Sequence, residues 1–160
     1  MTTGLERYYT LGASGLKVSR LALGTMTFGT DWGWGADRDT AQAMFDAYVE
    51  AGGNLFDTAD MYVGGESERL LGAFVKERGL RDRAVIASKF GYNADALNPN
   101  AGGNGRKAMM RAVEGSLTRL GTDYLDLYMV HTWDWVTPVD EVMRAFDDLV
   151  TSGKVLHVGL

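Results

Sequence analysis

The chain of 160 residues contains no cysteine and only two prolines. Without cysteine, a disulfide framework and thiolate chemistry are excluded, and the composition fits a reducing compartment such as the cytoplasm. No window approaches the roughly 20 consecutive apolar residues that a membrane-spanning helix needs. The first residues also lack the charged and then apolar order of a secretory signal. We therefore expect a cytoplasmic protein without a membrane span.

The sequence also lacks a cluster of basic residues. Its 21 acidic and 16 basic residues give a net charge of -5, so we expect no nucleic-acid partner. Apolar residues make up 46% of the chain, which is enough to bury a sizeable core, and one domain is the natural expectation for this length. The 21 glycines lie between periodic segments, which is typical of many short connections.

The periodic segments alternate between short apolar strands and amphipathic helices. A glycine-containing turn between Tyr8–Leu11 and Leu16–Val18 predicts a small hairpin at the start. Strands are then predicted at Leu21–Gly24, Asn54–Asp57, Ala84–Lys89, Tyr124–His131 and Val155–Gly159. Apolar residues at helical three-and-four spacing fill the intervals between these strands. Strands that alternate with helices in this way indicate a parallel sheet with right-handed crossovers.

Two of the predicted helices carry explicit start signals. Ser67 can act as the N-cap of the second helix. Thr137 and Pro138 are expected to be the cap and the first residue of the fourth helix, with Val139 facing inward.

Two architectures satisfy this pattern, the open doubly wound sheet and the closed eight-stranded barrel. Residues Leu23 to Gly29 read LGTMTFG, which lacks the G-x-G-x-x-G spacing of a dinucleotide-binding sheet. Polar residues instead gather at the ends of several strands, as on the active face of a barrel. We therefore predict an α/β fold, the (β/α)8 TIM barrel. A complete barrel has eight units in about 250 residues, so residues 1–160 are expected to be the N-terminal part of a single barrel domain: the hairpin and about the first four and a half βα units.

Chemistry is suggested by the residues at the strand ends. Asp57, Lys89 and His131 end three predicted strands, and Tyr62 follows the first of them. A tyrosine hydroxyl has a free pKa of about 10, so it exchanges protons near neutrality only if a nearby cation stabilises the phenolate. Lys89 could supply that cation, held by Asp57, while neutral His131 would donate a hydrogen bond to a carbonyl oxygen. This set lacks a nucleophile, so a bound nicotinamide is the expected source of electrons.

Each residue taken singly also has a plainer interpretation. Asp57 could cap a helix, Tyr62 could be packing, Lys89 a solvated strand end and His131 a satisfied core histidine. Only their joint placement favours a catalytic site.

Two other functions stay open at this point. In a barrel metallohydrolase, Asp57, His131 and Glu66 would bind a divalent ion, but such a site usually needs a second histidine near the first ligand. The sequence has only His131 and His157. Alternatively, the protein could be a binding module that holds the cofactor without useful turnover.

Four segments, in order, resemble the motifs of the aldo-keto reductase family. The stretch GGNLFDTADMY is similar to its first signature, GxxxFDTAxxY, and GESERLLG continues it. SLTRLGTDYLDLYMVH resembles the second signature, while SKFGY and GKVLHVGL also fit. These motifs are most similar to those of the branch that contains aryl-alcohol dehydrogenases and the β-subunits of potassium channels. The second function that this branch implies is a regulatory or channel-partner subunit.

The resemblance implies a function and a set of site residues. The function is the reversible, NADPH-dependent reduction of an aldehyde or ketone, with Tyr62 as the general acid and NAD(H) as a possible second cofactor. No metal is implied, and the partner is a small carbonyl substrate. The implied catalytic tetrad is Asp57, Tyr62, Lys89 and His131. The implied cofactor contacts are Gly24, Thr25, Met26 and Asp57, and the carbonyl pocket is lined by Trp32, Tyr62, His131 and Trp133.

Overall fold

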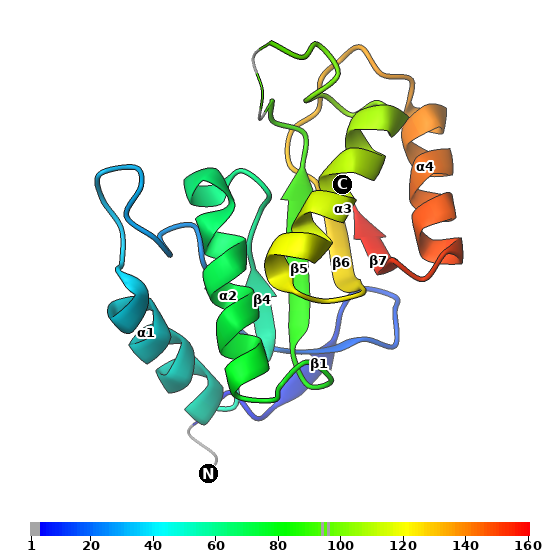
Figure 1. Ribbon diagram of the computed structural model, residues 1–160. Helices are drawn as coiled ribbons and strands as arrows, with labels where there is room; N and C mark the ends of the chain where they lie inside the picture. The colour runs from blue at the N-terminus through cyan, green and yellow to red at the C-terminus, as the bar shows by residue number, and fades with distance from the viewer. Residues whose placement is uncertain (1–3, 94, 96) are drawn as a thin grey trace.

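The computed structural model describes residues 4–93, 95 and 97–160, which form two sheets and four α-helices (Figure 1). The small sheet is an antiparallel hairpin of β1 (Tyr8–Thr10) and β2 (Lys17–Ser19). The large sheet is parallel throughout and consists of β3 (Ala22–Gly24), β4 (Leu55–Asp57), β5 (Val85–Phe90), β6 (Leu125–Val130) and β7 (Val155–Gly159). The predicted hairpin and the five predicted strands are confirmed, with ends that differ by at most one residue.

One helix lies between each pair of consecutive strands of the large sheet. These helices are α1 (Arg38–Glu50), α2 (Glu66–Glu77), α3 (Arg106–Leu120) and α4 (Val139–Thr151). Within the described ranges, none of them combines the length and the apolar character needed to cross a bilayer.

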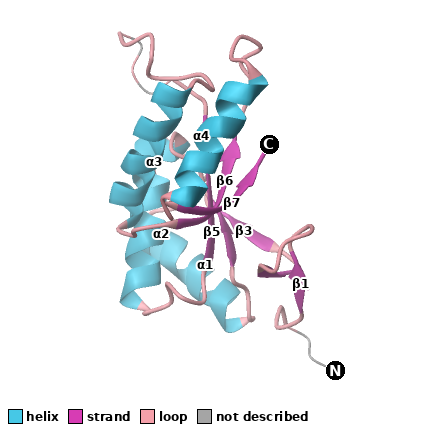
Figure 2. Ribbon diagram, turned by 90° about the vertical axis from the view of Figure 1, so that its right-hand side faces the viewer, coloured by secondary structure: helices cyan, strands magenta, loops and turns pink. Residues whose placement is uncertain are grey.

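The arrangement of the layers distinguishes the two predicted architectures. The strands lie in the sheet in chain order, β3-β4-β5-β6-β7, without a reversal. Figure 2 shows all four helices on one face of this sheet, while the hairpin lies off the other side. A doubly wound sheet has helices on both faces and a point where the strand order reverses. The structure is therefore an arc of a barrel, as predicted.

The strand register brings the ends of three strands to one edge. Gly24 of β3 pairs with Asp57 of β4, and Asp57 pairs with Ala87 of β5. Side chains alternate along a strand, so Ala87 and Lys89 lie on the same face as Asp57. Lys89 in turn lies beside Met129 near the end of β6. The sheet thus carries Asp57 and Lys89 on the face turned away from the helices.

The core fills the space between the sheet and the helices. Its fully buried aromatic side chains are Phe28, Phe45, Phe56, Phe74, Phe90, Tyr128 and Phe146. Phe45 of α1 stacks on Phe56 of β4 at 5.1 Å, and Phe90 of β5 stacks on Tyr128 of β6 at 5.1 Å. The aromatic layer fixes the strands against the helices, and through them the positions of the strand ends.

Helices α2 and α3 approach each other closely at Gly72. A Cβ atom placed on Gly72 would lie 2.2 Å from the carbonyl oxygen of Leu120. Only glycine allows this approach, because any side chain would push the two helices apart.

Two predicted helix starts are wrong. The cap position of α2 is Gly65, while Ser67 lies inside the helix, fully buried, and donates its hydroxyl to the carbonyl oxygen of Thr25 at 2.6 Å. The fourth helix begins at Val139, with Pro138 in the cap position. Thr137 instead donates its hydroxyl to Asp134 at 2.7 Å. Because the helix starts one residue later than predicted, Val139 lies in an open first turn and is 55% exposed.

Candidate active site

The centre of the site is the ammonium group of Lys89, at the end of β5. Its Nζ donates to Asp57 Oδ2 at 2.7 Å, to the carbonyl oxygen of Thr58 at 2.9 Å and to the hydroxyl oxygen of Tyr62 at 3.3 Å. An ammonium has three donors, and all three are used here. The Lys89 side chain is only 14% exposed, so these contacts hold it in one orientation. The predicted pairing of Asp57 with Lys89 is confirmed.

Tyr62 is presented by an unusual turn, η1 (Tyr62–Gly65). Val63, Gly64 and Gly65 have φ angles of 50°, 62° and 88°, all in the left-handed region. For a β-branched residue such as Val63 this conformation costs about 1 to 3 kcal/mol and persists only where packing enforces it. Val63 is 1% exposed, so its side chain is enclosed by the core. The turn therefore fixes the phenol within reach of Lys89.

His131 follows β6 directly and continues its ladder, because its N–H donates to the carbonyl oxygen of Phe90 at 2.8 Å. Its ring lies 5.6 Å from the ring of Tyr62, at an interplanar angle of 82°. Burial lowers the pKa of His131, the charge of Lys89 lowers it further, and the charge of Asp57 opposes both. The imidazole is therefore neutral at pH 7, as the sequence analysis expected.

The position of the imidazole proton follows from the surroundings of Nδ1. This atom is buried and, among the residues that the structure describes, has no hydrogen-bond partner. A buried N–H without an acceptor costs more than a buried lone pair, because C=O and ring nitrogen acceptors tolerate a missing partner better. We therefore assign the proton to Nε2, which leaves this atom as a donor toward the site.

The segment after His131 is held by hydrogen bonds between Asn104 and Asp134, which the sequence did not predict. Asn104, which is fully buried, donates its side-chain N–H to the carbonyl oxygen of Thr132 and accepts the N–H of Asp134 at 2.8 Å. In return, Asp134 accepts the N–H of Asn104, and it also accepts two N–H groups and one hydroxyl from Val136 and Thr137. Burial raises the pKa of Asp134, but these hydrogen bonds outweigh it and hold the pKa well below its usual range. The spacing of Asp134 and Thr137 was the available signal, since this pattern is typical of a side-chain-capped turn.

The predicted cofactor residues divide into two groups. Gly24 ends β3 beside Asp57, and a Cβ placed on it would meet no atom within 4 Å. Met26 is 43% exposed, so these two residues offer an open surface that fits a flat ring such as nicotinamide. Thr25, in contrast, is fully buried: its hydroxyl donates to the carbonyl oxygen of Asp57 and shares a hydrogen bond with Ser67. The hydroxyl of Thr25 thus supports the strand end from behind, and a contact of Thr25 with the cofactor stays a prediction.

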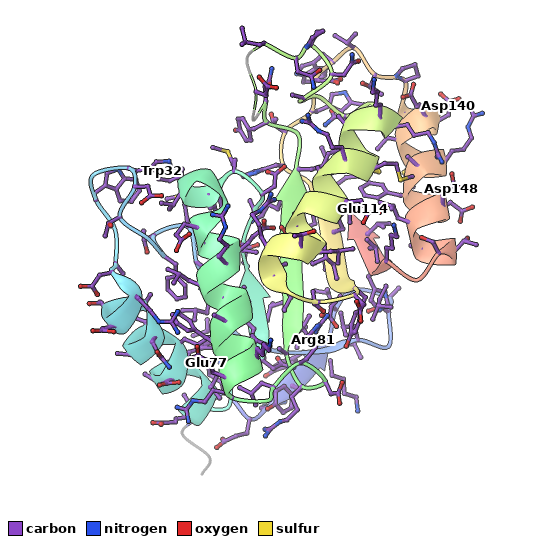
Figure 3. All side chains as sticks on the ribbon, viewed as in Figure 1. Trp32, Glu77, Arg81, Glu114, Asp140 and Asp148 are labelled. Atoms are coloured by element: carbon purple, nitrogen blue, oxygen red, sulfur yellow. The ribbon has the colours of Figure 1, made fainter. Side chains whose placement is uncertain are left out.

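The predicted pocket residues also differ from one another. Trp32 lies in the loop between β3 and α1, above α1 in Figure 3, and packs on Trp34 with ring centroids 5.5 Å apart. Trp133 packs against the hydrophobic core. The ring that packs on His131 besides Tyr62 is Tyr92, at 4.9 Å and 88°. Tyr92 ends the SKFGY segment, but the sequence did not predict its contact with His131.

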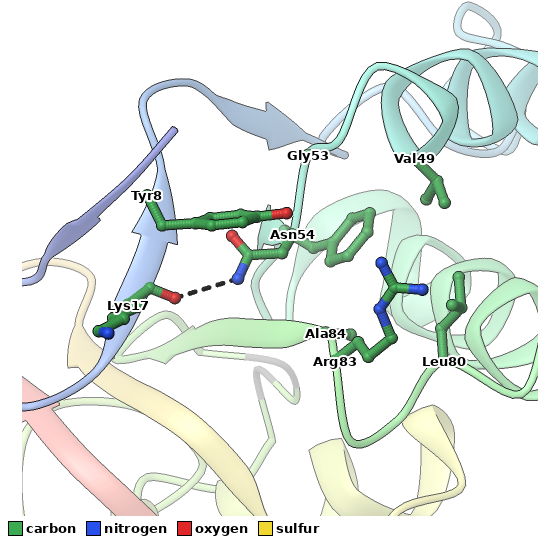
Figure 4. Close-up of a pocket in the computed structure, with 9 residues that line it drawn as sticks. Tyr8, Lys17, Val49, Gly53, Asn54, Leu80, Arg83 and Ala84 are labelled. Carbon is green, nitrogen blue, oxygen red and sulfur yellow. Dashed lines mark hydrogen bonds between the residues drawn. The ribbon is translucent and has the colours of Figure 1, made fainter. Parts of the chain in front are cut away.

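A cavity of about 280 Å³ lies away from these residues, between the hairpin and the N-terminal ends of β4 and β5 (Figure 4). Tyr8, Asn54 and Arg83 line it, and Asn54 donates to the carbonyl oxygen of Lys17 at 3.0 Å. None of the four predicted catalytic residues reaches it. The reactive groups converge at the opposite ends of the strands, so the candidate active site is placed there.

Among the described residues, the ligands expected for a metallohydrolase are not grouped around one point. The carboxylate of Asp57 is occupied by Lys89, and that of Glu66 pairs with Arg69 at 3.2 Å. Within the described residues, no three acidic or histidine side chains converge as a set of ligands.

Comparison with known proteins decides the family. The profile of the Aldo/keto reductase family matches residues 20–160. The chain belongs to this family. It is 43% identical over 155 residues to the norsolorinic acid reductase StcV of Emericella nidulans, a match that covers 92% of this chain and 40% of that protein. An aryl-alcohol dehydrogenase of Pestalotiopsis microspora is 35% identical, again over 92% of this chain and 40% of the relative.

A solved structure supports the same assignment. The aldo-keto reductase AKR11C1 from Bacillus halodurans, in its holo form, superimposes with a TM-score of 0.83 at 34% sequence identity. The match covers 96% of this chain and 49% of that chain. The predicted fold is therefore confirmed as part of an aldo-keto reductase barrel. The chain spans less than half the length of the curated relatives that it matches.

Proposed function

We propose that the protein carrying this chain reduces an aldehyde or ketone to the alcohol, reversibly, with NADPH as the hydride donor and Tyr62 as the general acid. NAD(H) is the second cofactor to test. The observation that carries the proposal is the ammonium of Lys89, which contacts Asp57 at 2.7 Å and Tyr62 at 3.3 Å at once. Two relatives are named for reducing norsolorinic acid and for dehydrogenating aryl alcohols, which fits a carbonyl–alcohol couple.

The chemistry of the four side chains is complementary. Tyr62 donates its proton to the carbonyl oxygen, and the ammonium of Lys89 stabilises the phenolate that remains. Asp57 and the carbonyl oxygen of Thr58 keep the ammonium oriented during this transfer. His131 donates its Nε2–H to the same carbonyl oxygen. For the reverse reaction, the phenolate accepts the proton of the alcohol.

The nicotinamide cofactor supplies the hydride when it is bound. Gly24 and Met26 would hold its nicotinamide end, because they form the exposed surface beside Asp57. Tyr62 would then present its proton to the oxygen of a carbonyl whose carbon lies against the nicotinamide end, and these fixed positions would lower the entropic cost of the reaction.

The test is steady-state oxidation of NADPH with a series of aliphatic and aromatic aldehydes, performed on the complete protein that carries this chain. A Tyr62→Phe variant should lose at least about a hundredfold in kcat, the usual contribution of a general acid, and keep its affinity for NADPH. Tyr9→Phe, a change in the distant hairpin, should leave both unchanged.

The second candidate function, a regulatory subunit that holds the cofactor, predicts another outcome. Wild-type protein would then bind NADPH with the same affinity as Tyr62→Phe, but it would show no turnover with any aldehyde. Unchanged turnover in Tyr62→Phe would overturn the proposed role of the phenol.

A further inference from the structure

We infer that Tyr92 is a positioning residue for His131: its ring shields the imidazole from water, keeps it neutral and fixes its orientation toward the substrate carbonyl. This inference rests on the proposed function for its consequence in catalysis. The contact itself is independent of that function.

Two aromatic rings enclose the imidazole of His131. Tyr62 approaches from the turn after β4, with centroids 5.6 Å apart, and Tyr92 approaches from the loop after β5, with centroids 4.9 Å apart. Both lie nearly perpendicular to the imidazole, at 82° and 88°. Tyr62 is already assigned to proton transfer. The role of covering the imidazole is therefore assigned to Tyr92.

Tyr92 is not a core residue. It is 45% exposed, and among the described residues the imidazole of His131 is the only aromatic ring in contact with it. Its packing is therefore directed at His131, in the preferred edge-to-face geometry of aromatic pairs.

The backbone on either side of the contact is fixed. Gly91, directly before Tyr92, has a φ of 134°, which favours glycine, and its carbonyl oxygen accepts the N–H of Gly103 at 2.9 Å. The neighbouring residue Asn104 donates to the carbonyl oxygen of Thr132, one residue beyond His131. The loop with Tyr92 and the segment with His131 are thus joined at their bases, and the ring contact is maintained by this connection.

The charged and titratable groups around the imidazole come from β4, β5, η1, the loop after β5 and the segment after β6. Lys89 of β5 and Asp57 of β4 act on it with opposite signs, and Tyr62 and Tyr92 contact it as phenols. Asp134, on the segment of His131 itself, is directed at backbone N–H groups. Burial is the largest cause of the lowered pKa of His131.

Removal of the Tyr92 ring would reduce the burial of the His131 imidazole, which is the largest cause of its lowered pKa. Water would reach the imidazole, and the charges of Lys89 and Asp57 would remain. The pKa of His131 should therefore rise toward its ordinary value near 6.5. Protonation at a given acidic pH then removes a larger share of the neutral imidazole.

The experiment measures the imidazole directly by NMR titration. The sequence has two histidines, and the signal that is lost in His131→Gln identifies the one of interest. Tyr92→Ala should raise the pKa of His131 by about half a unit or more, because desolvation is weakened. Tyr92→Phe keeps the ring and should leave the pKa unchanged. Tyr9→Ala is the matched control, since Tyr9 is similarly exposed at 42% but lies on β1.

The activity of the complete protein gives the second readout. In Tyr92→Ala, the acidic limb of the pH profile of kcat/KM should move to higher pH by the same amount as the pKa of His131. An unchanged pKa in Tyr92→Ala would overturn the inference, whatever the activity. A shifted pKa in a protein that reduces no carbonyl would support the contact and overturn the proposed function instead.

Discussion

Replacement of Asp60 with asparagine should stabilise the protein above neutral pH. Asp60 lies in the loop between Asp57 and Tyr62, and its Oδ1 is buried without a hydrogen-bond partner among the described residues. Burial raises the pKa of Asp60, the charge of Glu68 adds to this and the charge of Arg119 opposes it, which together bring the pKa to about 7. Asparagine has nearly the same shape as the protonated acid and carries no charge at any pH.

The sign follows from proton linkage. Between about pH 4 and pH 7 the folded protein holds the proton of Asp60, while the unfolded chain has released it. Stability conferred by this group therefore falls as the pH rises through that window, and the loss is complete above pH 7. The difference from the ordinary value of 3.8 to about 7 corresponds to about 4 kcal/mol as an upper limit. Partial exposure of the side chain reduces the expected effect to about 2 to 3 kcal/mol.

The assay is urea denaturation at a series of pH values from 4 to 8, followed by tryptophan fluorescence. Asp60→Asn and wild type should be equally stable near pH 4, and the variant should be the more stable one by about 2 to 3 kcal/mol at pH 8. Asp82→Asn, a change at an exposed aspartate, should follow the wild-type curve. Parallel curves for wild type and Asp60→Asn would show that the pKa of Asp60 is not raised in the folded protein.

Two further substitutions test the packing behind the site by denaturant unfolding. Arg119→Met removes the partner of Glu68, which is fully buried and contacts Arg119 at 2.6 Å, so stability should fall by about 3 kcal/mol. Adding Glu68→Gln should recover at least half of that loss, and no recovery would contradict the charge argument. Gly72→Ala should destabilise by about 2 kcal/mol, because the new Cβ would lie 2.2 Å from the carbonyl oxygen of Leu120. Helix propensity alone predicts a gain of about 1 kcal/mol for this change. A loss of stability would therefore show that the close contact outweighs helix propensity, and a gain would show the opposite.

Periodicity and strand-end residues were enough to predict the barrel and the grouping of Asp57, Lys89 and His131. Both depend on local patterns: an apolar strand that stops at a polar residue, and helices at regular intervals. In a parallel sheet, equivalent strand ends meet at one edge, so a local pattern determines a contact between residues far apart in the sequence.

The features of the site that the sequence did not predict depend on contacts between loops, and periodicity does not encode such contacts. Thr25 is polar and lies at the end of a strand, like Asp57, but it is buried and its hydroxyl is hydrogen-bonded to Ser67 of α2. The left-handed conformation of Val63 is unexpected for a β-branched residue and arises from its enclosed side chain. The contact of Tyr92 with His131 requires two loops in a fixed relative position.

The most direct test of the account follows both the hydride and the phenol in one reaction. Complete protein carrying this chain is mixed with NADPH deuterated at the transferring position and an aldehyde, and the alcohol is analysed by mass spectrometry after a single turnover. We expect one deuterium on the carbinol carbon with wild type, and at least about a hundredfold slower formation of the same labelled alcohol with Tyr62→Phe. Unlabelled product, or an equal rate in the two proteins, would contradict it.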